Sequence, residues 1–119
     1  MADISFTAAY ASVVEDPEEG FVFIGLAEGE DETESYVLFR QALTGGPVWF
    51  ELGGDEFGAE DALLSVRRAG DTLQIALRPD RAARFGFALA VEVGLAGCED
   101  AEAALEALRE MLPGQWKDG

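Results

Sequence analysis

The chain has 119 residues, of which 24 are acidic and eight are basic, and its net charge is −16. That length fits one domain, and the charge argues against nucleic acids and anionic membranes as partners, since both are bound through basic patches. Residues 1–60 hold 14 acids and one base, Arg40, whereas residues 61–119 hold ten acids and seven bases, so the excess negative charge lies in the first half.

Four β-strands are predicted in the first half of the chain. Residues 4–14 alternate apolar with small or polar side chains at a period of two, which indicates one strand with a single buried face. Residues 21–26 are apolar at every position except Gly25, as is typical of a central strand covered on both faces. Gly25 itself marks either a bulge or a close backbone approach. Residues 36–43 and 48–52 predict the third and fourth strands.

Two acidic connections accompany these strands. Residues 28–35 separate the second strand from the third, and residues 53–61 form a second acidic loop centred on Phe57. The first loop lacks the regular acid spacing and the glycine of an EF-hand, so we expect a solvated hairpin tip there and no metal site.

The second half of the chain predicts a hairpin, a short helix, a strand and a longer helix. Residues 64–78 contain two alternating runs around a Gly-containing turn, which indicates a β-hairpin. Pro79 and Gly86 suit the start and the end of a short helix. Residues 89–95 alternate again, and from Glu99 the apolar residues follow the spacing of one helical face.

Together these elements predict a single domain over residues 1–119 of the α+β class. We expect a mostly antiparallel, twisted β-sheet of six to seven strands, with the short helix and a C-terminal amphipathic helix packed on one face. Two tryptophans stay open. Trp49, beside an outward-facing Glu51, is either an exposed interface anchor or part of the core, and Trp116 either folds back on the helix or is free.

Catalytic chemistry finds little support in the composition. The chain has no His, which removes the commonest general base and metal ligand and excludes triads built on His. The single Cys98 can form neither a zinc site nor an internal disulfide, and the latter fits a reducing compartment. The N-terminus has no basic segment followed by a long apolar run. We therefore expect a cytoplasmic protein that is not an enzyme and holds no cofactor or metal; an enzyme built on a carboxylate pair would need two buried acids in a deep pocket.

One basic feature breaks the acidic pattern. Arg78, Arg81 and Arg84 are spaced by three and line one side of the short predicted helix. They either dock an acidic patch, such as one on a second copy, or balance nearby acids of the same chain.

The order of elements is similar to that of a known family. The apolar runs at 21–27, 36–43, 49–52 and 63–77, the turn at 82–86 and the final acidic helix together resemble the Imm10 family of bacterial immunity proteins. The resemblance implies a non-catalytic protein that neutralises a polymorphic toxin domain by stoichiometric binding. Many such toxins are nucleases, whose basic phosphate-binding surfaces would attract a chain of charge −16.

On that basis we expect the chain to bind a cognate basic toxin, as a monomer or weak homodimer, through its acidic loops. The expected partner-binding residues are Glu28, Glu30, Asp31, Glu32, Glu34, Asp55, Glu56 and the apolar anchor Phe57. The alternative is an acidic adaptor or secretion-chaperone-like module that uses the sheet face or the terminal helix, and a stable homodimer through Trp49 would favour it. The acidic surface could also serve solubility alone.

Overall fold

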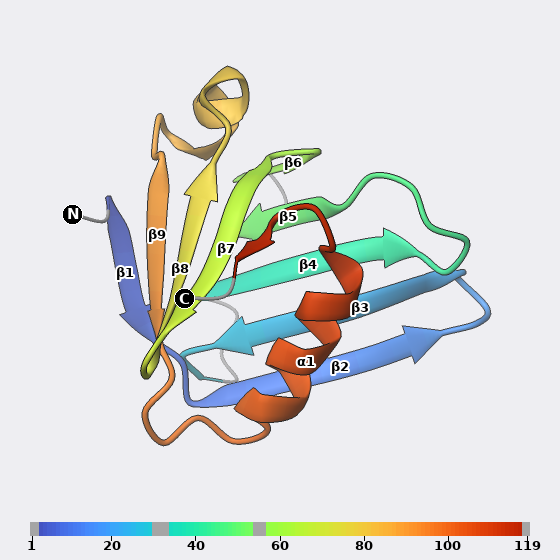
Figure 1. Cartoon of the computed structure of the whole chain (residues 1–119), viewed down its shortest axis with the longest axis horizontal. Coiled ribbons are helices and arrows are strands. Elements are labelled where there is room, and N and C mark those ends of the chain that lie inside the picture. Colours follow the sequence, from blue (N-terminus) through green and yellow to red (C-terminus); the bar gives the residue numbers. More distant parts are fainter. Residues whose placement is uncertain (1–2, 30–33, 54–56, 118–119) are drawn as a thin grey trace.

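The computed structural model describes residues 3–29, 34–53 and 57–117, which form two five-stranded sheets and two helices (Figure 1). The strands are β1 (Ile4–Thr7), β2 (Tyr10–Asp16), β3 (Phe21–Ala27), β4 (Tyr36–Ala42), β5 (Trp49–Leu52), β6 (Gly58–Glu60), β7 (Leu63–Ala69), β8 (Thr72–Leu77), β9 (Ala90–Gly94) and β10 (Trp116–Lys117). The helices are the 3₁₀ helix η2 (Pro79–Phe85) and the α-helix α1 (Ala101–Met111).

The two sheets differ in how their strands connect. Strands β2 to β6 follow one another in sequence order and pair antiparallel, so we call this the meander sheet. The other has the order β1-β9-β8-β7-β10, and its two outer strands, β1 and β10, join their neighbours in parallel, so we call it the mixed sheet. The predicted α+β class and the predominance of strands are confirmed. The predicted count of six to seven strands in one sheet is wrong, because ten strands divide between two sheets.

The division begins within residues 4–14, which were predicted as one strand. The chain bends at Ala8 and Ala9, whose backbone amides donate to different sheets: Ala8 N to Gly94 O at 2.8 Å and Ala9 N to Ala27 O at 2.8 Å. β1 therefore belongs to the mixed sheet and β2 to the meander sheet. The alternation of side chains continues across the bend, so a period of two could not reveal it.

Two short strands lie where the sequence predicted none. β6 falls inside the expected loop at 53–61, and β10 occupies the expected polar tail. Trp116 in β10 is half-buried against the core, so it does fold back on the molecule. Of the two options left for Gly25, the bulge is wrong, because the register of β3 is continuous; the close neighbour of a Cβ at Gly25 would be the side chain of Ser12, whose Oγ would lie 3.3 Å away, and not a backbone atom.

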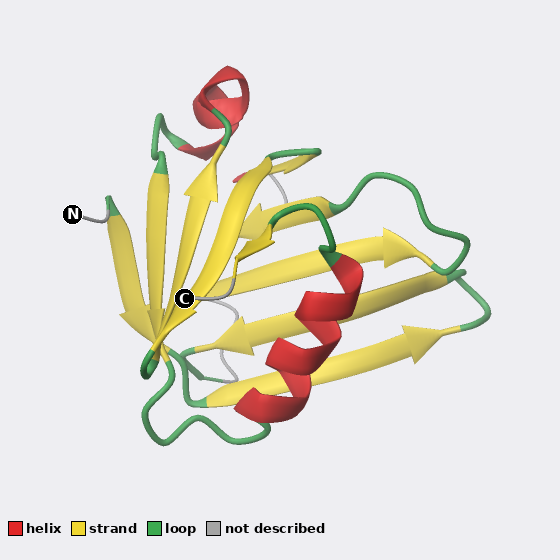
Figure 2. Ribbon diagram, in the orientation of Figure 1, coloured by secondary structure: helices red, strands yellow, loops and turns green. Residues whose placement is uncertain are grey.

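The core lies between the two sheets and α1. The apolar stripe of α1 is buried against β2 and β3, which confirms the prediction of an amphipathic C-terminal helix on one sheet face (Figure 2). Three aromatic rings, Phe39, Phe50 and Phe85, stack in tilted pairs with centroid distances of 5.1 and 5.6 Å and tie η2 to the meander sheet. Each such fully buried side chain stabilises the fold by about 1.5–3 kcal/mol through removal of apolar surface from water.

Short helix η2 forms as Pro79 and Gly86 predicted. Pro79 occupies the first turn, and Gly86 adopts φ 64°, a left-handed conformation that glycine accepts without the penalty of a side chain. The N-terminal segment is fixed to the start of β9, where Asp3 Oδ2 accepts the amides of Leu89 and Ala90 at 2.8 and 3.0 Å. These two backbone hydrogen bonds lower the pKa of Asp3 because they favour its charged form.

Candidate partner-binding surface

The two acidic connections singled out by the sequence emerge at the same end of the meander sheet. Glu28 N donates to Ser35 O at 2.9 Å and Gly53 N donates to Tyr36 O at 3.0 Å, so the described ends of both connections flank the start of β4. Glu28 is exposed and Glu34 is half-buried. The other expected acids, Glu30, Asp31, Glu32, Asp55 and Glu56, lie outside the described residues.

The expected apolar anchor, Phe57, is 43% exposed at this end of the molecule. Its side chain lines a hollow of about 300 Å³ together with Ile4, Phe6, Tyr36, Leu52 and Phe85. The hollow brings β1 of one sheet next to β4 and β5 of the other, and most of its lining side chains are apolar. Phe57 therefore stands at the rim of a hollow large enough for an apolar side chain of a partner.

A second feature, which the sequence indicated only through Trp49 and a possible sheet-face interface, is the outer face of the meander sheet, which points away from α1. The register of β2 to β5 places large, mostly aromatic side chains next to one another on this face. Its large members are Tyr10, Val14, Phe21, Phe23, Tyr36, Leu38, Arg40 and Trp49. Tyr10 and Val14 are 43% and 50% exposed, and the other six are half-buried. The expectation that residues 21–26 are covered on both faces is therefore wrong.

The outer face of the mixed sheet provides an internal comparison. There the paired positions carry small or polar residues, and the one large apolar exception is Leu64, 57% exposed at the register shift of β7. The paired positions are Ser5, Thr7, Ser65, Arg67, Thr72, Gln74, Ala76, Ala90, Glu92 and Gly94. A sheet face that only meets water normally looks like this. Among the described residues, the outer face of the meander sheet is therefore the one that gathers large aromatic side chains.

Arg40, the single base of the first 60 residues, lies in the middle of the aromatic face. Its guanidinium carbon is 5.1 Å from the ring centroids of both Phe21 and Trp49, which are contributed by the strands on either side. The positive charge is attracted to the electron-rich ring faces, so the three side chains support one another. This contact holds two large aromatic rings in defined positions at the surface.

Glu51 performs a similar task with hydrogen bonds. Its carboxylate accepts Trp49 Nε1 at 3.1 Å and also accepts the hydroxyl of Tyr36. Glu51 was expected to face solvent, but only 9% of it is exposed, because its side chain lies beneath these two polar aromatic residues. Trp49 is neither a fully exposed anchor nor part of the core, because its ring is half-buried. The ring packs over Gly58, where a Cβ would lie 2.2 Å from it.

Acidic side chains border this aromatic face. The β2–β3 turn carries Glu18 and Glu19, whose amides donate to Asp16 Oδ1 at 3.1 Å each, so Asp16 fixes the turn. Glu60 is exposed on the outer face of β6, at the opposite side of the sheet, and Glu28 stands at the loop end. The described face therefore has an aromatic centre and an acidic border.

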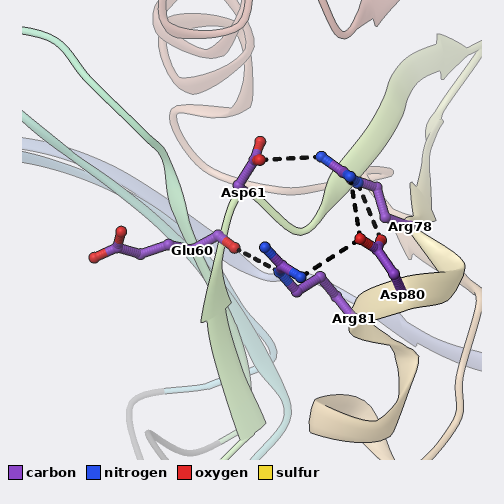
Figure 3. Close-up of polar contacts among 5 residues, drawn as sticks. All are labelled: Glu60, Asp61, Arg78, Asp80 and Arg81. Carbon is purple, nitrogen blue, oxygen red and sulfur yellow. Dashed lines mark hydrogen bonds and ion pairs between the residues drawn. The ribbon is translucent and has the colours of Figure 1, made fainter.

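Of the three arginines spaced along the short helix, Arg78 and Arg81 follow the second interpretation that the sequence left open, whereas Arg84 is exposed and shows no such contact within the described residues. Arg78 Nη1 lies 3.0 Å from Asp61 Oδ2 and Arg78 Nη2 lies 3.1 Å from Asp80 Oδ2, while Arg81 donates to the carbonyl of Glu60 and also meets Asp80 (Figure 3). These side chains balance acids of their own chain and tie η2 to β6 and the turn after it. They do not form an open basic patch.

No group of three metal-binding side chains occurs within residues 3–29, 34–53 and 57–117. Cys98 is half-buried, and burial raises the pKa of its thiol, with a smaller contribution from nearby acids. None of the helices in the described ranges is long and apolar enough to traverse a bilayer. Comparison with family models, curated proteins and solved structures gave no match to this chain.

Proposed function

We propose that this chain is a stoichiometric binding protein that neutralises a basic toxin domain, for example that of a nuclease. The observation that carries the proposal is the aromatic outer face of the meander sheet with its acidic border. Tyr, Trp, Phe and Arg are the side chains enriched at the centres of protein interfaces, and a polar rim surrounds such centres. The toxin is the class of partner that the resemblance to immunity proteins implies.

The polar contacts beneath this face support a role in tight binding. Glu51 and Arg40 hold Trp49 in position before a partner arrives, so less side-chain freedom is lost on association. Aromatic anchors that are fixed in advance give large contact areas at a low entropic cost. A purely solubilising surface would need neither the rings nor their supports.

Electrostatics supports a basic partner over a neutral one. A net charge of −16 produces a field that accelerates the approach of a positively charged protein. A basic nuclease domain presents such a surface because it binds phosphates. In this proposal the protein acts in the cytoplasm, as a monomer or weak homodimer, without nucleic-acid or membrane contacts and without catalysis.

The alternative function, an acidic adaptor or secretion-chaperone-like module, would use the same face for a partner that is not a toxin. A stable homodimer through Trp49 would favour it. A net charge of −16 on each copy opposes a stable homodimer, which places this alternative second.

A growth-rescue assay tests the proposal. The C-terminal domain encoded by the open reading frame beside this gene is expressed under tight control, with and without this protein. We expect the domain to arrest growth and this protein to restore it. If the neighbouring domain does not arrest growth, or arrests it equally in the presence of this protein, the toxin proposal is contradicted and the adaptor function is favoured.

A further inference from the structure

Within the described residues, strand β2 forms one edge of the meander sheet, because its only partner strand is β3 and its other side carries just an isolated bridge between Tyr10 and Glu99. On its other side, Ala11 N donates to Glu99 O at 2.9 Å and Glu99 N donates to Ala9 O at 3.0 Å. Backbone groups point to opposite sides of a strand at alternate residues. Since Ala11 points away from β3, Val13 and Glu15 also direct their N–H and C=O groups away from it, beyond the short contact with Glu99.

The side chains along this edge are unusually apolar for an uncovered strand. Val13 is 41% exposed on the inner face, while Tyr10 and Val14 are exposed on the outer face. A long, regular edge of this kind is normally shielded by a bulge, a proline or lysines, since it otherwise recruits another strand. β2 spans seven residues in continuous register with β3 and contains no bulge, proline or lysine; Glu15 is a charged residue on its inner face, and the contact with Glu99 shields only its first residues.

The charge at this edge selects among possible occupants. Glu15 is exposed on β2 itself, and Asp16, Glu18 and Glu19 follow directly in the adjoining turn. A second copy of this chain would bring an equally acidic edge, on a molecule of charge −16, against this one. Like charges on neighbouring strands oppose pairing, whereas lysine or arginine side chains on an added strand would pair with these acids.

We propose that β2 is a strand-addition edge that accepts an extended, basic segment of the protein partner. The added strand would bond to the outward backbone groups of Val13 and Glu15, beyond the contact with Glu99, and place apolar side chains beside Val13 and Val14. Main-chain hydrogen bonds would then supply affinity, and the neighbouring acids would supply selectivity for basic segments. The class of partner rests on the function proposed above; the binding mode does not require that the partner be toxic.

The test uses the full chain and a short synthetic peptide that alternates lysine with valine. Hydrogen exchange of individual amides is followed by NMR at saturating peptide. One added hydrogen bond should slow the exchange of Val13 and Glu15 roughly five- to ten-fold, since a net bond contributes about 1 kcal/mol. Ser12 and Val14, whose amides point to β3, should change little. The control is the same peptide methylated at every backbone nitrogen, which keeps the charge but cannot donate to the C=O groups of Val13 and Glu15, and whose methyl groups block the close approach of a paired strand.

Unchanged exchange at Val13 and Glu15, or equal slowing with the methylated peptide, would overturn the proposal. Two variants extend the test: Val13→Pro removes the outward N–H, whereas the control Val13→Ala keeps it. Edge strands tolerate proline where the N–H faces solvent. We expect Val13→Pro to weaken peptide binding roughly five- to ten-fold more than Val13→Ala. A wild-type dimer that Val13→Pro converts to a monomer would instead identify a second copy as the occupant and overturn the basic-partner proposal.

Discussion

The close fit between Trp49 and Gly58 leads to a quantitative prediction for Gly58→Ala. A Cβ at residue 58 would lie 2.2 Å from Cζ2 and 2.8 Å from Cε2 of the Trp49 ring, distances that no relaxed structure keeps. If the ring stays, the overpacking costs about 1–3 kcal/mol. If it swings away, the hydrogen bond to Glu51 (about 1.5–3 kcal/mol) and the contact with Arg40 (about 0.5–1 kcal/mol) are lost.

The two outcomes overlap at about 2–3 kcal/mol, which is the expected loss in the free energy of unfolding. Urea unfolding measures it, and tryptophan emission in a Trp116→Phe background reports the position of Trp49. Gly114→Ala is the matched control, because a Cβ there meets nothing within 4 Å. Its effect should stay within about 0.5 kcal/mol. Adding Trp49→Ala should remove most of the cost of Gly58→Ala, since the two sites are coupled.

An unfolding free energy for Gly58→Ala within about 0.5 kcal/mol of the wild type, with unchanged emission, would refute this reasoning. It would mean that the Trp49 ring does not lie over Gly58. The supports inferred for the aromatic face would then need revision.

Three further predictions concern charge. Asp3→Ala should destabilise the fold at neutral pH, because the pKa of Asp3 in the folded state is lowered from 3.8. The stability difference from the wild type should shrink as pH falls through the folded-state pKa, and urea unfolding across a pH series measures it. Glu102→Gln removes the ion pair with Arg68 that joins α1 to β7 at 2.7 Å. The loss of folding stability should be small and weaker in high salt, as for other surface ion pairs. Because this ion pair lowers the pKa of Glu102, the loss should disappear at acid pH, where the carboxyl group is protonated. Charge reversal at residues 30–32 should slow association with a basic partner and weaken its salt dependence in stopped-flow measurements, whereas unchanged rates would remove these residues from the interface.

Local features of the fold were predictable from the sequence, because short-range patterns determine them. The hairpin at 64–78 is specified by two alternating runs around one turn, and α1 by the spacing of its apolar residues. Both patterns refer to neighbours in the chain. The position of Pro79 and Gly86 likewise fixes the bounds of η2.

The partition into two sheets could not be predicted in the same way. Neither Ala8 nor Ala9 is a turn-forming residue type. Strand β1 is separated from β2 by two hydrogen bonds, in which the amides of Ala8 and Ala9 donate to the carbonyls of residues 94 and 27. Parallel pairing of Trp116 with Val66 is likewise a long-range contact. Such contacts depend on how distant segments meet, and alternation within one segment does not encode that.

The aromatic face was predictable only in part. The apolar run at 21–26 indicated that both sides of β3 carry large side chains, but not that one side lacks a cover. The burial of Glu51 depends on Tyr36, which is 15 residues away, so the residue looked like an ordinary outward acid. Phe57 is 43% exposed, which leaves it accessible to a partner, and its role as an anchor stays a prediction.

The most direct test of the central claim compares variants on the two uncovered sheet faces in the growth-rescue assay. Tyr10→Ala with Val14→Ala alters the aromatic face, and Thr72→Ala with Gln74→Ala alters the polar face of the mixed sheet as a control. Neither pair of substitutions removes a core side chain, and the free energies of unfolding of both variants are compared with the wild type as a check. We predict that the first pair loses rescue and the second retains it. Full rescue by the first pair, at equal expression and stability, would contradict the claim that the aromatic face binds the partner.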